Sequence, residues 1–146
     1  MNELSHIKGF LETQGLAVLS TISGTQPYCN LVAFAAVDDL SYLIFATKRN
    51  TRKYDNLRHN SKVSLLMDNR RNRVTDFDET TALTVMGEAR ELSDNRDDIE
   101  LYLNKHPSLK NFASEPDCVL FKVVIESLVV ASSIRQASTI RRETLD

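Results

Sequence analysis

The sequence predicts a mainly β protein in which six strands form a closed or partly closed antiparallel barrel with accessory helices. Six apolar stretches rich in Val, Ile, Leu and Thr alternate with short clusters of turn residues. The connections between the first three stretches are too short for a crossover, so these strands must be antiparallel. The 146 residues, 42% of them hydrophobic, can form a substantial core, and we expect a single domain over residues 1–146.

The first half of the chain contains a helix followed by three strands. Four apolar residues at helical spacing predict an amphipathic helix over residues 2–14: Leu4, Ile7, Phe10 and Leu11. Nearly continuous apolar and β-branched residues then predict strands over residues 16–22, 28–37 and 41–47. Glycine, proline and aspartate predict turns at residues 23–27 and 38–39.

The next segment changes from strand to helix and back. Tyr54 and Leu57 can share one helical face, and Thr51 is a good N-cap, so a two-turn helix is expected over residues 51–59. Gly87 lies inside a later apolar stretch, where a glycine often marks a bulge or a close backbone approach. The remaining strands are expected over residues 62–68, 81–92 and 118–131.

A further helix separates the last two strands. Ser93 or Asp94 is expected to cap it, and it should end at Lys105, just before Pro107. One more helical turn is expected near residues 109–112. Two segments have no periodic pattern: residues 69–80, expected to form a loop, and the polar tail from residue 132.

Composition and charge exclude several classes of protein. A formal net charge of -2 argues against a general nucleic-acid-binding domain, which is usually strongly basic. No apolar stretch approaches the length of a membrane span, and the N-terminus lacks the apolar centre of a signal peptide. Cys29 and Cys118 are isolated, which suits buried, reduced thiols in a cytosolic protein. We therefore expect a cytoplasmic protein that binds no nucleic acid, no membrane and no metal.

Basic residues are concentrated between Lys48 and Arg73, a segment with nine of the 18 Lys and Arg residues and two Asp. Arg52 and Lys53 fall in the first turn of the expected helix, where a cation costs about 0.3–1 kcal/mol. An anion on the free N–H groups of that turn would reverse this effect. With the hydroxyls of Thr47 and Thr51, the segment predicts a cradle for a monophosphate.

Other interpretations of this basic segment remain open. Charged stretches are often only a solvated face. A nucleic-acid patch is the weaker alternative, because Tyr54 is the one aromatic residue among the basic ones. A nucleoside-triphosphate loop is not indicated, since the chain has no GxxxxGK[ST] stretch.

Two adjoining stretches resemble a known family. They read GLAVLSTISGTQPYCNLVAFAAVDD (residues 15–39) and LIFATKRNTRKYDNLRHNSKVSLLMDN (residues 43–69). Their order of strand, turn, strand and Thr-Arg-Lys helix start resembles the pyridoxamine 5′-phosphate oxidase-like family of FMN-binding split barrels. The resemblance implies a six-stranded antiparallel split barrel and a homodimer. It also implies two FMN molecules in clefts at the subunit interface, built from both chains.

The resemblance implies which residues contact the flavin phosphate. Ala46 and Thr47 match the family's pair at the end of a strand. Arg52 and Lys53 match its Arg-Lys pair, in agreement with the cradle inferred from charge. The complete set of candidates at the phosphate end is Ala46, Thr47, Lys48, Thr51, Arg52 and Lys53.

A second set of residues is implied for the isoalloxazine ring. Asn30, Leu31 and Val32 begin the segment whose backbone runs beside the ring in the family. A glutamine that often reaches the ring is absent near Ala82. Thr84 lies on the same face of its strand and is the expected substitute.

This chain also departs from the true oxidase. Asn30 and Ala35 stand where the oxidase has Arg and Lys, and His106 and Lys110 stand where it has Arg and Ser. Tyr102 matches the oxidase's tyrosine in the same helix. The oxidase's C-terminal Arg-and-His motif has no counterpart in SSIRQASTIRRETLD. These departures argue against pyridoxamine phosphate oxidation and leave Tyr102 and His106 as the substrate-side candidates.

The function expected from the sequence is that of an FMN-binding flavoprotein, an oxidoreductase acting on an unknown small substrate. The flavin would accept a hydride from a reduced nicotinamide or an organic donor, and no catalytic side chain is assigned. The alternative is a haem- or flavin-binding carrier or sensor without flavin turnover, with His106 as a candidate haem ligand. The third hypothesis is a plain interaction module with a basic face.

Overall fold

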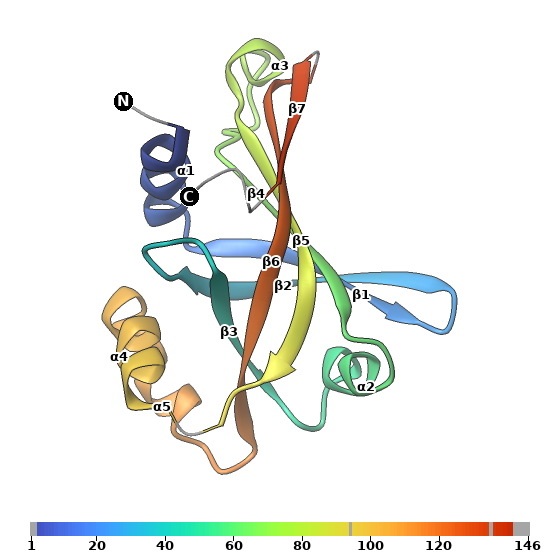
Figure 1. Ribbon diagram of the computed structural model, residues 1–146, viewed down its shortest axis with the longest axis vertical. Helices are drawn as coiled ribbons and strands as arrows, with labels where there is room; N and C mark the ends of the chain where they lie inside the picture. Colours follow the sequence, from blue (N-terminus) through green and yellow to red (C-terminus); the bar gives the residue numbers. More distant parts are fainter. Residues whose placement is uncertain (1–2, 94, 135, 142–146) are drawn as a thin grey trace.

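The computed structural model describes residues 3–93, 95–134 and 136–141. Three consecutive strands follow the first helix, and helices separate the next three strands (Figure 1). The helical elements are α1 (Glu3–Thr13), α2 (Arg52–His59), α3 (Asp76–Glu79), α4 (Arg96–Lys105), the 3₁₀ turn η1 (Pro107–Leu109) and α5 (Lys110–Ala113). The strands are β1 (Leu16–Ser23), β2 (Gln26–Ala36), β3 (Tyr42–Lys48), β4 (Lys62–Asp68), β5 (Ala82–Glu91), β6 (Cys118–Ser133) and β7 (Gln136–Arg141).

The strands form one antiparallel sheet in the order β3-β2-β1-β4-β5-β6-β7. A further pairing of β3 with β6 closes the first six of these strands into a barrel. Strand β7 pairs with the far end of β6 and lies outside the closed ring. The six-stranded antiparallel barrel with accessory helices that the sequence predicts is therefore confirmed, with one additional strand.

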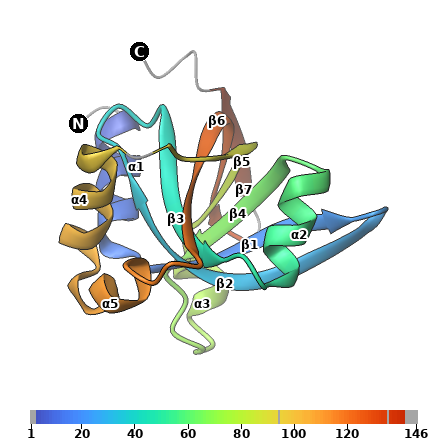
Figure 2. The same cartoon turned by 90° about the horizontal axis from the view of Figure 1, so that it is seen from below.

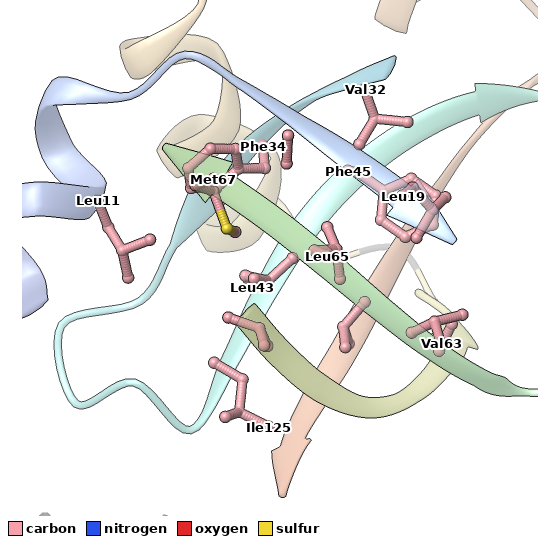
Figure 3. Packing of buried hydrophobic residues seen from close by; sticks show 14 of the residues in the cluster. Leu11, Leu19, Val32, Phe34, Leu43, Phe45, Val63, Leu65, Met67 and Ile125 are labelled. Carbon is pink, nitrogen blue, oxygen red and sulfur yellow. The ribbon is translucent and has the colours of Figure 1, made fainter. Parts of the chain in front are cut away.

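The barrel interior is filled by side chains that alternate with outward-facing ones along each strand. Leu19, Phe34, Phe45 and Val85 come from four different strands and are fully buried there. The rings of Phe45 and Phe121 stack with their centroids 5.5 Å apart. Figure 3 shows the cluster converging from several strands, with a leucine of α1 beside it.

Part of the outer face of the barrel is covered by helices. Ala35, Ile44 and Ala46 point outward from β2 and β3 and form a second apolar cluster with Tyr102 of α4. The helices α4 and α5 lie on one side of the barrel, and α2 lies on the opposite side (Figure 2). The two sides therefore offer separate environments for ligands.

Polar contacts hold α4 against the strands and against α1. The Tyr42 hydroxyl donates to a carboxylate oxygen of the buried Asp98 at 2.6 Å, and this bond raises the pKa of Tyr42 to about 12. The Lys105 ammonium donates to the carbonyl oxygen of Leu11 at 3.0 Å. It also lies 3.9 Å from the centroid of the Phe34 ring. Burial lowers the pKa of Lys105 to about 8.

The shifted pKa of Lys105 predicts a pH-dependent stability that Lys105→Met should abolish. Below about pH 8 both the folded and the unfolded chain carry the proton, so the burial penalty is fully present. Between about pH 8 and 10.5 the unfolded chain holds a proton that the folded chain has released, so stability rises with pH. Urea unfolding of wild type and K105M between about pH 8 and 10.5 measures this effect. As pH rises, the free energy of unfolding of wild type should increase relative to that of K105M. A constant difference would contradict the shift.

The first hairpin is tighter than the sequence suggests. The hairpin turn expected at residues 23–27 is present, but it is shorter than predicted, because Ser23 belongs to β1 and Gln26 and Pro27 already belong to β2. Gly24 has φ 64, a conformation open to glycine, and this allows a two-residue turn. Pro27 pairs with Ile22, and at this end β2 has no partner on its other side within residues 3–93, 95–134 and 136–141, so the missing N–H costs nothing.

Three further expectations are corrected. Residues 69–80 are not wholly irregular, because one helical turn, α3, lies within them. The N-cap of α4 is Asn95, whose side chain accepts from the N–H groups of Asp97 and Asp98; Ser93 is not the cap, and Asp94 lies outside the described residues. The tail contains β7, which adds the buried Ile140 to the core.

The glycine inside β5 has the role that its position predicts. The register between β5 and β6 shifts between Met86 and Gly87, as in a β-bulge. A Cβ atom on Gly87 would lie 2.0 Å from the carbonyl oxygen of Val124. The backbones approach so closely here that no side chain fits.

Candidate functional site

The predicted cradle lies where β3 ends and α2 begins. Thr51 is the N-cap, with φ -103 and ψ 157, and its hydroxyl oxygen accepts from the N–H of Tyr54 at 3.3 Å. The helix and the cap are therefore confirmed. The backbone N–H groups of Arg52 and Lys53 have no acceptor within the described part of the chain. This turn keeps two free donors.

The two threonine hydroxyls close the turn instead of standing free. The Oγ1 atoms of Thr47 and Thr51 lie 3.0 Å apart, and Thr51 Oγ1 donates to the carbonyl oxygen of Lys48 at 2.8 Å. Thr47 is fully buried, whereas Thr51 is half-buried. The hydroxyls therefore fix the shape of the cradle, and its free donors are the N–H groups and the basic side chains.

The basic residues before the helix are neutralised by the protein itself. Lys48 pairs with Glu115 and lies 4.0 Å from Asp117, so its side chain is tied to the segment before β6. Arg49 pairs with Glu91 at 2.9 Å, and it also donates to the hydroxyl of Tyr54. Neither cation is therefore free to neutralise an anion at the helix start.

Arg52 and Lys53 differ from these upstream cations. Neither has a carboxylate partner among residues 3–93, 95–134 and 136–141. Arg52 is exposed and Lys53 is half-buried, and burial lowers the pKa of Lys53. The local excess of positive charge thus lies in the first turn of α2.

Strand β2 brings a second group of residues to this turn. The guanidinium carbon of Arg52 lies 5.1 Å from the centroid of the Tyr28 ring. Asn30, two residues further, lies on the same face of β2. Its side-chain oxygen is buried and has no hydrogen-bond partner among the described residues. Tyr28 was missed from the sequence, although the period-two pattern that starts from Asn30 points to it.

A buried polar pair fixes α2 on the barrel. The Asn56 side-chain nitrogen donates to the hydroxyl of Thr21 on β1 at 3.0 Å, and both side chains are buried. Leu57 adds an apolar contact to the core on the same side of the helix. In Figure 2, α2 lies over the hairpin of β1 and β2. The helix start is therefore held in a fixed position against β2.

The remaining cofactor candidates lie on different faces. Val32 points into the core with 4% exposure, and Leu31 points outward with 63% exposure. Ala46 is buried in the cluster beneath α4. Thr84 lies on the outer face of β5, in register with Leu66 of β4. Within a single chain, Thr84 therefore does not lie at the first turn of α2, where Arg52 is.

The two substrate-side candidates bind the backbone of β2. The Tyr102 hydroxyl donates to the carbonyl oxygen of Ala33 at 3.2 Å, and burial raises the pKa of Tyr102 to about 12. The His106 Nε2 atom lies 2.7 Å from the carbonyl oxygen of Phe34, so it must carry the hydrogen. These hydrogen bonds hold α4 against β2. A ligand could bind to either side chain only if it replaced the hydrogen bond to β2. The substrate role of Tyr102 and His106 stays a prediction.

Some expected absences can be examined in the described residues. They contain no group of three or more His, Cys, Asp or Glu side chains that could hold a metal ion. None of their helices is both long enough and apolar enough to span a membrane. The expectation that both cysteines are buried is wrong, because Cys29 is exposed on the outer face of β2. Cys118 is half-buried.

Comparisons with solved structures agree with this geometry at the level of the fold. A heme binding protein from Mycobacterium smegmatis superposes with a TM-score of 0.86 at 10% identity, over 99% of this chain and 60% of that one. The heme storage protein HutZ from Vibrio cholerae gives 0.75 at 17% identity, over 93% and 100%. General Stress Protein 26 from Bacillus anthracis gives 0.71 at 23% identity, over 97% and 99%. These likenesses establish the split-barrel fold.

Sequence comparisons address the family itself. A search of curated protein sequences finds no match. The model of the family described as pyridoxamine 5′-phosphate oxidase matches residues 4–129, which cover the closed barrel, α2 and α4. The chain therefore belongs to the pyridoxamine 5′-phosphate oxidase-like family.

Proposed function

We propose that this chain binds FMN, with the flavin phosphate at the first turn of α2 and the ring system beside β2. The observation that carries the proposal is the positive charge of Arg52 and Lys53, which have no carboxylate partner among the described residues, next to two backbone N–H groups without an acceptor there. A monophosphate supplies the negative charge and the acceptor oxygens that this turn lacks. Lys53 is half-buried and has no counter-ion in the described part of the chain, an arrangement that an anion would stabilise.

The neighbouring strand also suits this cofactor. A buried polar atom without a hydrogen bond is uncommon in a folded protein, and the side-chain oxygen of Asn30 is such an atom. A ring N–H or a ribityl hydroxyl of FMN is a suitable donor to it. The ring of Tyr28 restrains the Arg52 guanidinium, so Arg52 loses less side-chain entropy when it binds a phosphate.

An oxidoreductase function follows from the cofactor and not from a catalytic side chain. Bound FMN would supply hydride acceptance and electron transfer. The chain's own residues bind the phosphate, orient the ring and exclude water from one side of it. The donor and the acceptor of electrons therefore depend on the substrate side of the site, where this chain departs from the true oxidase.

The cofactor can be tested by reconstitution of the purified protein. With FMN we expect a bound flavin spectrum, quenched flavin fluorescence and one flavin per chain. Reduction of the bound flavin by NADH or NADPH in stopped flow would support an oxidoreductase, and failure with both would support a carrier. Haem is the alternative ligand, because two proteins with this fold are described as heme proteins. A Soret band on haem addition, with no FMN bound, would overturn the proposal.

The proposal includes a homodimer with the cofactor at its interface. Leu31, Val18, Leu66 and Thr84 are aligned in register across β2, β1, β4 and β5. They form one outward-facing row, in which Leu31 and Leu66 are 63% and 36% exposed. Exposed apolar rows of this kind mark interfaces. Three strand spacings, about 14 Å, separate Thr84 from Leu31, so Thr84 can reach a ring beside β2 only from a second chain.

Replacing Leu31 by glutamate should therefore convert the dimer to a monomer. The side chain is exposed in the single chain, so the fold should tolerate the charge, whereas a dimer interface would have to bury it. Val74→Glu is the matched control, because Val74 is 81% exposed and lies in the segment before α3, outside the row of Leu31, Val18, Leu66 and Thr84. Sedimentation velocity should show a dimer for wild type and V74E and a monomer for L31E. A monomeric wild type would contradict the interface.

A further inference from the structure

A cavity on the side of the barrel away from α2 has no part in the proposed flavin site. It has a volume of about 290 Å³, opens to solvent, and is lined by α1, by α4, by the end of β2 and by the connection between β2 and β3. Its lining combines apolar side chains, among them Leu11, Ala36, Leu40 and Leu101, with the charged Lys8, Glu12 and Asp38 at its rim. Lys105 is the basic residue that α4 contributes to its lining.

The amine of Lys105 is held in one position at this cavity. Its Nζ atom donates to the carbonyl oxygen of Leu11 at 3.0 Å. It also lies over the ring of Phe34, 3.9 Å from the ring centroid. Since the side chain is already fixed, little conformational entropy remains to be lost when the amine reacts.

Burial also makes this amine more reactive than an ordinary lysine. It lowers the pKa of Lys105 to about 8. About a tenth of the side chain is then neutral at pH 7, against about one part in 2,500 for an unperturbed lysine. A neutral amine is a nucleophile, and desolvated lysines form Schiff bases with carbonyl compounds.

We propose that Lys105 forms an imine with small aldehydes or ketones that enter this cavity. The amine nitrogen attacks the carbonyl carbon to give a carbinolamine. Loss of one water molecule then gives the imine, and no oxidant or reductant takes part. Glu12 lines the same cavity, and its carboxylate can carry the proton needed for loss of water.

The contacts of Lys105 suit the product as well as the free amine. A protonated imine keeps a single N–H, and the carbonyl oxygen of Leu11 is the acceptor already aligned with it. The positive charge remains over the ring of Phe34, which stabilises a cation. The leucine and alanine side chains of the lining favour aliphatic carbonyl compounds of a size that fits about 290 Å³.

Reductive trapping on the wild-type protein tests this proposal. The folded protein is incubated with butanal and cyanoborohydride at neutral pH, and peptide mass spectrometry quantifies alkylation of each of its seven lysines. We expect Lys105 to react at least about tenfold faster than Lys110, its exposed neighbour on α5. Equal or slower labelling of Lys105 would overturn the proposal.

A second aldehyde separates the cavity from simple amine reactivity. Oxidised dextran, a polymeric aldehyde, cannot enter a cavity of about 290 Å³, so it should label Lys110 and leave Lys105 unmodified. If the bulky aldehyde also labels Lys105 first, the amine reacts from solvent and the cavity is not the site. In 8 M urea the preference for Lys105 should disappear with both aldehydes. None of these readouts depends on flavin binding.

Discussion

Replacing Arg52 and Lys53 together by alanine is expected to weaken FMN binding by at least about 100-fold and to leave riboflavin binding unchanged. Each side chain would make a charge-assisted hydrogen bond to the phosphate, worth about 1.5–3 kcal/mol. Two such bonds correspond to about 3–6 kcal/mol, or 10²–10⁴ in affinity. Riboflavin has no phosphate, so it reports only on the ring and ribityl contacts.

The measurement is quenching of flavin fluorescence, titrated for both flavins on each protein. Arg58→Ala with Lys62→Ala is the matched control, because it also removes two positive charges, and Lys62 pairs with Glu88 outside the cradle. FMN affinity should stay within about threefold of wild type in this control at 0.15 M salt, where distant charges are screened. Equal losses for FMN and riboflavin would show that the double variant acts through the fold and would reject the phosphate cradle.

Sequence reasoning locates this cradle because its features are local. The N-cap of α2 and the two cations in its first turn lie within three residues, and helix polarity turns them into an anion site. The partners of Lys48 and Arg49 could not be predicted, since Glu115 and Glu91 are more than 40 positions away in the chain. Long-range pairing thus decides which cations of the basic segment remain free.

The fold shows the same division between local and long-range information. The first six strands were predictable because each has its own apolar pattern, and the first three are also joined by short turns. Strand β7 was not, since it carries few apolar residues and gains its stability by pairing with β6. Helix α3 is only one turn long, too short to show a hydrophobic period. Thr75 at its N-cap does not predict the helix either, because the threonine side chain makes no capping hydrogen bond.

The exposure of Cys29 has a similar origin. The residues around Cys29 do not alternate clearly between apolar and polar, so the sequence does not indicate which face of β2 this side chain occupies. The register with β1 decides that it points outward. In this register Cys29 lies opposite Ser20 and one alternation from Leu31, on the outer face. Burial of that face would require a second chain, as proposed above.

Substitution of Gly87 by alanine is expected to destabilise the barrel by at least about 3 kcal/mol. The new Cβ atom would lie 2.0 Å from the carbonyl oxygen of Val124 and 3.0 Å from its carbonyl carbon. Both of these atoms belong to the backbone of β6, so no side-chain rotation can relieve the overlap. The strands would have to separate at the bulge, and the ladder between β5 and β6 would lose hydrogen bonds there.

Gly9→Ala is the control with the opposite expectation. Gly9 lies inside α1, and a Cβ atom there meets nothing within 4 Å. Alanine is favoured over glycine in a helix interior by about 0.5–1 kcal/mol, so this variant should be slightly more stable than wild type. Urea denaturation should therefore move the two midpoints in opposite directions. An unchanged midpoint for G87A would mean that β5 and β6 can separate at the bulge without cost, and that the close approach does not require glycine.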